Sequence, residues 1–149
     1  MTSQAWQALG AYETICKCRW LDYDGLSWCN LRGGQNTCTY QKSIVDYYGQ
    51  AKLAYYAHRM AFQEVLACSG DVDMVYGPED KVSVILLNLG EEKEVTFKLE
   101  VVSMDGQLVY TKEIPHILLE AGRTKMDVGE VDLPDIAEGI YSMNYQVYS

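Results

Sequence analysis

Few residues in this sequence have a type and spacing that could do chemistry, and two neighbouring cysteines come first among them. Cys16 and Cys18 form a Cys-x-Cys pair, which can bind a metal ion or carry a redox reaction. Residues two apart on a helix do not share a face, however, and no second cysteine pair or histidine pair follows. We therefore expect free thiols or small buried side chains here, and neither a metal site nor a cofactor.

The two histidines give no stronger signal of catalysis, and neither do three of the acids in the first 50 residues. His58 and His116 have neither a nucleophile nor a metal ligand at a telling spacing, so structural or solvated roles are expected. Asp22 and Asp24 fall in a predicted polar loop. Asp46 stands before a turn at Gly49, which its side chain can fix. The residues by themselves predict no catalytic group.

Charge and cysteine content divide the chain in two. The whole sequence has 12 Lys/Arg and 21 Asp/Glu, a net charge of −9. Up to Ser69 six bases stand against five acids, and from Gly70 onward six bases stand against sixteen acids. All five cysteines fall in the first part. We expect two segments of different origin, and the acidic second segment argues against nucleic-acid binding, which needs a basic surface.

The overall composition is that of a folded chain. Apolar residues make up 48% and charged residues 22%. No run approaches the roughly 18 apolar residues that a membrane-spanning helix needs, so no membrane partner is expected. The start at Met1–Trp6 lacks the basic residues and apolar core of a signal peptide.

The first segment reads as helix, strand, loop and helix. Helix-forming residues follow a potential N-cap and predict a helix over Ser3–Trp20. The mostly apolar run Leu26–Leu31 is bounded by glycines and predicts a short buried strand of the parallel type, with a long loop from Gly33. A second helix is predicted over about residues 51–64. Its packed face is expected to be the apolar stripe of Leu53, Tyr56, Ala57, Met60 and Ala61. This order is typical of an α/β repeat.

After Gly70 the hydrophobic period becomes that of β-strands. Asp105-Gly106 is a strong signal for a tight hairpin. Short strands with turns about every ten residues predict an antiparallel β-sandwich of immunoglobulin-like size, although no Cys-Trp-Cys core is present. The strands are expected at Lys81–Asn88, Val95–Val102, Leu108–Lys112, Ile117–Glu120, Thr124–Val131 and Gly139–Tyr148.

A stretch between the two segments resembles a known family. Residues Ser43–Tyr56 read Ser-Ile-Val-Asp-Tyr-Tyr-Gly-Gln-Ala-Lys-Leu-Ala-Tyr-Tyr. They resemble the entry to the last barrel helix of family 2 glycoside hydrolases, the β-mannosidase, β-galactosidase and β-glucuronidase group. Further along, after Phe62, Glu64 stands where that family usually has proline. Upstream, Gly25-Leu-Ser-Trp-Cys-Asn30 resembles the eighth barrel strand of the family. The runs that resemble its C-terminal sandwich are Val82–Asn88, Asp105–Val109 and Pro134–Tyr141.

The resemblance implies an α+β fold. Residues 1–66 would form a truncated (β/α) barrel tail of two helices and one short strand, and residues 67–149 an immunoglobulin-like antiparallel β-sandwich. The parent enzyme would hydrolyse β-linked glycosides with retention, through two glutamates about 5 Å apart on barrel strands that would precede Met1. Asp22 and Asp24 would lie at the non-catalytic end of their strand. The resemblance thus implies no catalytic residue, metal or cofactor here, and a supporting role that leaves the chain inactive alone.

Trp28 is the candidate substrate-binding residue. The family places a tryptophan at the end of this strand, facing the sugar, and the resemblance implies that role only in a complete barrel. Carbohydrate would then be a partner through the parent enzyme. The apolar faces of Ser3–Trp20 and Leu26–Leu31 need cover, which predicts self-association or docking on the missing barrel.

An alternative function belongs to the second segment alone. It would be a carbohydrate-binding or protein-interaction β-sandwich module. Tyr141, Tyr145 and Tyr148 in the last predicted strand could form a glycan-binding platform, or they could pack on the face of the sheet. Binding of oligosaccharide that depends on Tyr141 and Tyr145 would favour the platform.

Overall fold

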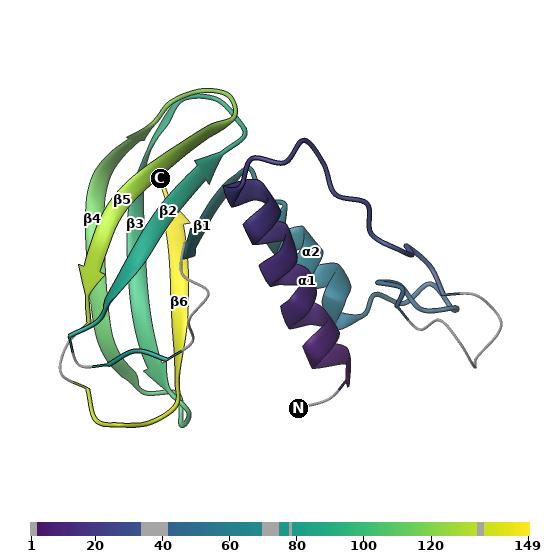
Figure 1. Cartoon of the computed structure of the whole chain (residues 1–149), viewed down its shortest axis with the longest axis horizontal. Coiled ribbons are helices and arrows are strands. Elements are labelled where there is room, and N and C mark those ends of the chain that lie inside the picture. The colour runs from purple at the N-terminus through teal and green to yellow at the C-terminus, as the bar shows by residue number, and fades with distance from the viewer. Residues whose placement is uncertain (1–2, 34–41, 70–74, 78, 134–135) are drawn as a thin grey trace. The chain divides into compact units, whose positions relative to one another are not determined.

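The chain has two compact units, Met1–Gln63 and Glu64–Ser149 (Figure 1). The computed structural model describes residues 3–33, 42–69, 75–77, 79–133 and 136–149. Most of the predicted long loop, with Cys38, lies outside the described residues, as does the turn residue Pro134.

Two helices that pack against each other form the first unit. Helix α1 (Ser3–Trp20) has the predicted bounds, and α2 (Leu53–Ala61) lies within the predicted range. Neither helix is both long and apolar enough to cross a membrane. Arg19, in the last turn of α1, donates hydrogen bonds of 2.7 Å from Nη1 to the carbonyl oxygens of Ala61 and Gln63. A cation from α1 therefore holds the carbonyl end of α2, where positive charge stabilises a helix.

The prediction for the packed face of α2 is wrong. The buried side chains are Ala54, His58 and Ala61, whereas three large members of the expected stripe are exposed. Leu53, Tyr56 and Met60 keep 50, 52 and 55% of their surface. Since the distance between packed helices depends on the side chains at their contact, a face rich in alanine lets α2 approach α1 closely. Leu53, Tyr56 and Met60 lie outside this contact and are exposed.

The predicted barrel tail is wrong as well. Residues 26–31 form no strand, and Leu26 and Leu31 at its ends are exposed. In the described part of the first unit, the β-pairing consists of isolated bridges from Val45 to Arg32 and to Ala51. A buried parallel strand needs neighbouring strands and covered faces, which an apolar run cannot supply by itself. The fold is mostly β-sheet with two helices, not an α+β barrel fragment.

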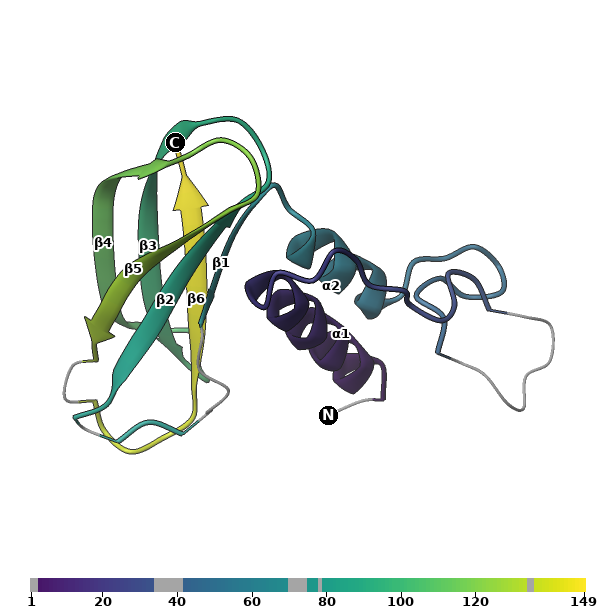
Figure 2. The ribbon, with the colours of Figure 1, turned by 45° about the horizontal axis from the view of Figure 1, so that its top comes forward.

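The second unit is β-sandwich-like, as the sequence predicts. Its described residues form two three-stranded antiparallel sheets, with strand orders β1-β2-β5 and β4-β3-β6. Figure 2 shows the first sheet lying across the second. The strands are β1 (Val65–Ser69), β2 (Lys81–Asn88), β3 (Lys93–Ser103), β4 (Leu108–Leu119), β5 (Thr124–Asp132) and β6 (Tyr141–Tyr148).

Strand alternation builds the core between the sheets. Val82, Val84 and Leu86 of β2 are fully buried, and Phe97 and Leu99 of β3 face them from the other sheet. In β3 the neighbouring side chains are only partly buried, as the period of two requires, whereas in β2 Ile85 and Leu87 on the other face are buried as well. Burying large aliphatic and aromatic side chains contributes roughly 1.5–3 kcal/mol each, so this layer is the main source of stability in the unit.

Strand β4 differs from its prediction at a proline. The hairpin at Asp105-Gly106 is confirmed, because Ser103 and Gln107 pair across it at 2.9 Å and Gly106 has a φ of 83°. The two strands predicted after it are a single strand, however. Pro115 lies in an edge strand, where a missing N–H is tolerated, and the register with β3 shifts beside it. His116 is in this bulge with a φ of 58°, not in a connection between strands.

Candidate functional site

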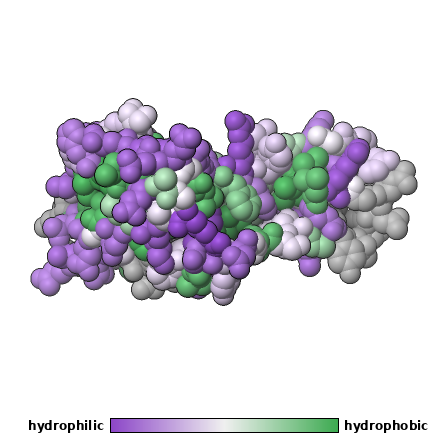
Figure 3. Space-filling view, turned by 90° about the horizontal axis from the view of Figure 1, so that it is seen from above, coloured by the Kyte–Doolittle hydropathy of each residue, from purple (hydrophilic) through white to green (hydrophobic). Residues whose placement is uncertain are grey.

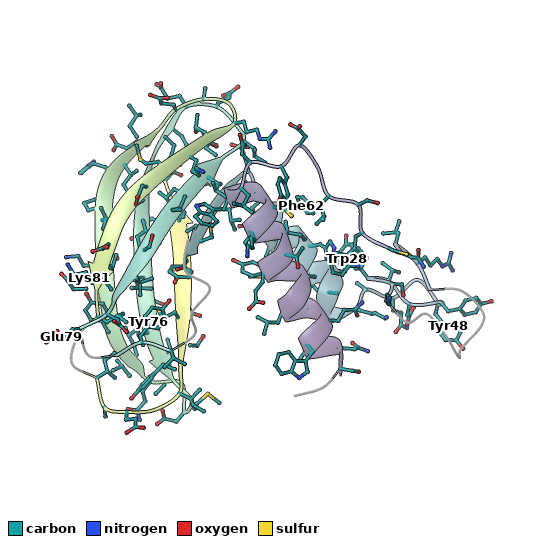
Figure 4. The ribbon with its side chains drawn as sticks, viewed as in Figure 1. Trp28, Tyr48, Phe62, Tyr76, Glu79 and Lys81 are labelled. Atoms are coloured by element: carbon teal, nitrogen blue, oxygen red, sulfur yellow. The ribbon has the colours of Figure 1, made fainter. Side chains whose placement is uncertain are left out.

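The segments around Trp28 and Asp46 are held together by backbone hydrogen bonds. Amide nitrogens of residues 44 and 45 donate to carbonyl oxygens of residues 30 and 31, at 3.2 and 2.9 Å, and Gly33 donates back to Val45 at 2.9 Å. The chains approach closely there, since a Cβ on Gly33 would lie 3.2 Å from the hydroxyl of Ser43. These bonds fix an irregular segment in which Trp28 lies beside α2 (Figure 4).

Trp28 makes an edge-to-face contact with His58 of α2. The ring centroids are 4.8 Å apart and the planes meet at 84°, a favourable arrangement for aromatic rings. Nδ1 of His58 lies 2.7 Å from the carbonyl oxygen of Ala54. That oxygen can only accept, so Nδ1 carries a proton and donates this hydrogen bond. His58 is therefore a buried structural residue, and the solvated role is wrong.

The same two rings carry unpaired polar atoms. Nε1 of Trp28, a donor, and Nε2 of His58 are buried and have no hydrogen-bond partner among the described residues. Trp28 itself is half-buried. The site is thus an aromatic pair with two unpaired ring nitrogens, and a role in sugar binding for Trp28 stays a prediction.

The acids near Trp28 have other surroundings. Oδ1 of Asp46 accepts from the backbone N–H of Gln50 at 2.7 Å, which confirms that Asp46 fixes the turn at Gly49. Asp22 and Asp24 are exposed in the loop after α1. Across the described ranges, no three His, Cys, Asp or Glu side chains gather as a metal ion would require.

The tyrosines of β6 do not share one platform. The ring of Tyr145 stacks on Phe97 of the core at a centroid distance of 6.1 Å, so strand-face packing is confirmed for this residue. Tyr141 donates from its hydroxyl to the carbonyl oxygen of Ala137 at 2.8 Å, across the corner that leads into β6. Tyr148 belongs to the opposite side of the strand and is exposed.

The outer face of the β4-β3-β6 sheet carries a polar network around Tyr148. Its hydroxyl donates to Glu113 at 3.0 Å, Lys98 lies 2.7 Å from Glu100, and Gln146 donates to Glu100 at 3.1 Å. The hydrogen bond to Glu100 raises the pKa of Lys98. Partial desolvation and then the bond to Glu113 raise the pKa of the Tyr148 hydroxyl. These groups satisfy one another across the strands, as in an ordinary solvent-facing ladder.

Sequence reasoning missed the polar side chain that is most deeply buried in the second unit. Asn88, at the end of β2, is fully buried. Its Nδ2 donates to the carbonyl oxygens of Glu91 and Glu120 at 3.0 and 2.8 Å, and its Oδ1 accepts from the N–H of Gly90 at 3.0 Å. The available signal was an asparagine two residues before a glycine at a strand end, a common turn pattern that says nothing of the distant Glu120.

Solved structures show where this fold occurs. A crystal structure of an exo-chitosanase from Amycolatopsis orientalis matches 97% of the chain with a TM-score of 0.72 and 15% sequence identity, over 17% of its own chain. A complex of a variant of that enzyme with PNP-β-D-glucosamine matches 95% of the chain with a TM-score of 0.62 and 16% identity, over 18% of its own chain. No family model and no curated protein sequence matches the chain.

A β-D-mannosidase from Dictyoglomus thermophilum matches 71% of the chain at 22% identity, over 12% of its own chain. Its TM-score of 0.46 is too low to support a shared fold. The chain therefore has the fold of a section of a glycoside hydrolase and spans less than a fifth of that enzyme. This agrees with the predicted likeness to family 2 glycosidases at the level of the fold.

Proposed function

We propose that this chain is a non-catalytic part of a glycoside hydrolase of the family 2 type, where it supports the catalytic domain, and that it hydrolyses no glycoside alone. The observation that carries the proposal is the match to the exo-chitosanase, which extends over 97% of this chain and 17% of the enzyme. The segment Ser43–Tyr56 points to the same family independently, through its sequence.

The chemistry of glycoside hydrolysis supports the non-catalytic part of the proposal. A retaining glycosidase needs two carboxyl groups about 5–5.5 Å apart, one of them a general acid whose pKa is raised by an apolar pocket. The buried polar side chains in the described part of the chain are Ser43, His58 and Asn88, and none of these is a carboxyl group. Asp46, the acid within the family-like segment Ser43–Tyr56, is engaged with the backbone of Gln50.

The test is turnover by the purified chain. We expect no release of nitrophenol from nitrophenyl β-mannoside, β-galactoside, β-glucuronide or β-glucosaminide beyond the rate in buffer. A mock purification from cells without the chain is the control for contaminating enzymes. Turnover that exceeds this control and co-purifies with the chain would show that the chain is catalytic, and the proposal would be wrong.

Calorimetry that measures binding of a panel of oligosaccharides tests the alternative function, a glycan-binding β-sandwich. The stacking of Tyr145 on Phe97 leaves its ring engaged in the core, so we expect no binding through a Tyr141/Tyr145 face. Binding that is lost on Tyr141→Ala would favour the alternative.

A further inference from the structure

One side of α2 presents an exposed surface of interface-forming residues. Leu53, Tyr56 and Met60 recur at the spacing that places side chains on one side of a helix, and Arg59 is exposed next to them. We call these four residues the α2 face. Tyrosine, methionine and arginine are the residue types enriched in protein interfaces. The unit that carries this face has six Lys/Arg and four Asp/Glu in residues 1–63, so it is weakly basic.

The second unit exposes an apolar patch around the β3–β4 hairpin. Val102 pairs with Leu108, and Ser103 pairs with Tyr141, so Met104 and Ile140 follow next to each other beyond the last pair. Met104, Leu108 and Ile140 keep 78, 55 and 76% of their surface. We call Val102, Met104, Leu108 and Ile140 the hairpin patch. Figure 3 views the chain from the other end of these strands and shows apolar side chains lying open among polar ones there as well.

Two acids, Asp105 and Glu138, lie close to the hairpin patch in the sequence. Asp105 is in the hairpin turn, and Glu138 is exposed two residues before Ile140. A hydrogen bond from the Ser103 hydroxyl lowers the pKa of Asp105, so this carboxylate stays charged well below neutral pH. The unit as a whole has six Lys/Arg against seventeen Asp/Glu in residues 64–149. An apolar partner with a positive edge fits such a surface better than a neutral or acidic one.

We propose that the α2 face of one copy of this chain binds the hairpin patch of a second copy. Both surfaces are apolar at their centre, and Arg59 at the edge of the first is opposite in charge to Asp105 and Glu138 at the edge of the second. Pairing two α2 faces would bring arginine toward arginine, and pairing two hairpin patches would bring acids toward acids. Charge thus favours the unlike pair, in which each copy uses one surface and offers the other.

The geometry of such a contact sets its strength and its product. Each surface offers three or four large side chains, which is small beside the ~800 Å² per partner of a standard interface. We therefore expect weak, reversible association. Because the contact joins two different surfaces, each copy can bind a neighbour through each of them, and the product is an open chain, a closed ring or a reciprocal dimer.

The first arm of the test is the mass of the full chain by sedimentation over a wide range of concentrations, about 1–500 μM. The wild-type mass should rise with concentration. Met60→Glu in the α2 face and Ile140→Glu in the hairpin patch should each raise the dissociation constant at least about tenfold. Leu31→Glu and Leu118→Lys change exposed leucines outside both surfaces and should leave it unchanged. Circular dichroism of every variant controls for folding.

The second arm mixes the two variants. Met60→Glu keeps an intact hairpin patch and Ile140→Glu keeps an intact α2 face, so the mixture should form a 1:1 complex that does not grow further. A wild-type mass that stays monomeric throughout the range overturns the proposal. Contact between like surfaces also overturns it, and would appear as association abolished by only one of the two substitutions, with no complex on mixing.

Discussion

Asn88→Ala tests whether a single buried amide holds one end of the sandwich together. The side chain joins two parts of the chain: the β2–β3 turn, through Gly90 and Glu91, and the β4–β5 connection, through Glu120. Alanine keeps the backbone of β2 and removes all three hydrogen bonds.

The expected loss is about 3 kcal/mol. A typical intramolecular hydrogen bond contributes about 1 kcal/mol net, and a buried group left without its partner costs about 1–3 kcal/mol. The carbonyl oxygen of Glu120 also accepts from the Thr124 hydroxyl at 3.0 Å, so it is not left bare, which keeps the estimate near the sum of three ordinary bonds. For a unit of this size, about 3 kcal/mol corresponds to a melting temperature lower by roughly 12–24 °C.

Denaturant unfolding followed by far-ultraviolet circular dichroism measures this loss. All three tryptophans, Trp6, Trp20 and Trp28, precede residue 64, so tryptophan fluorescence reports the first unit separately. The matched control is Asn144→Ala on the outer face of β6, where an exposed amide is lost at a cost within about 0.5 kcal/mol. A loss below about 1 kcal/mol for Asn88→Ala, or one no larger than the control, would refute the reasoning.

Asn88→Asp sharpens the test through pH. The aspartate keeps an acceptor for Gly90 but turns a carboxylate toward the carbonyl oxygens of Glu91 and Glu120, which raises its pKa in the folded state. Its protonated form is therefore favoured by folding. The stability deficit relative to wild type should be smallest below the unfolded pKa of about 3.9 and should grow as pH rises through the folded pKa. A deficit independent of pH would contradict this account.

Two further substitutions probe the other polar contacts. Arg19→Ala removes a charged donor from the carbonyl end of α2 and should destabilise the first unit by about 1.5–3 kcal/mol in the tryptophan-detected transition. The control is Lys17→Ala, exposed in the same turn, which should change the stability by less than about 0.5 kcal/mol. Equal effects of the two substitutions would mean that the bonds from Arg19 to α2 contribute little. Tyr141→Phe removes the hydrogen bond from the hydroxyl to Ala137 before β6 and should lower the free energy of unfolding by about 1 kcal/mol, measured by thermal unfolding. Tyr148→Phe, whose partner is an exposed carboxylate, should lower it by less than about 0.5 kcal/mol. The reverse order would show that the bond to Ala137 is dispensable.

Local pattern predicted the elements whose own sequence determines them. The bounds of α1 and β2 follow from helix-forming residues and from a short run of β-branched and other apolar residues, and the hairpin follows from Asp105-Gly106. The sequence predicts two strands on either side of Pro115, a residue that is usually excluded from the interior of a strand. Proline is tolerated in an edge strand with a bulge, because its missing N–H is not needed there. Only the pairing of neighbouring strands shows which strand is at the edge.

The remaining differences come from contacts between distant parts of the chain. A helical pattern shows that α2 has an apolar side, but α1 decides which side is buried, and it selects Ala54, His58 and Ala61. The run at Leu26–Leu31 has the composition of a buried strand, but a strand exists only with a partner to pair with. The contact of Trp28 with His58 joins residues 30 positions apart, and no local spacing encodes it.

The interleaved strand order has a consequence for how the second unit is assembled and how it comes apart. Strand β2 pairs with β5 and strand β3 pairs with β6, so each of these pairings must form after two intervening strands have been synthesised. At the far ends of the pairings the partner residues are roughly fifty positions apart in the sequence. Neither sheet can be completed before the chain has contributed to the other, so assembly should be slow, on the millisecond-to-second scale of folds with long-range pairing. For the same reason, a protease that cuts between β4 and β5 would leave two fragments, each carrying strands of both sheets. Such fragments should stay bound to each other without a covalent link.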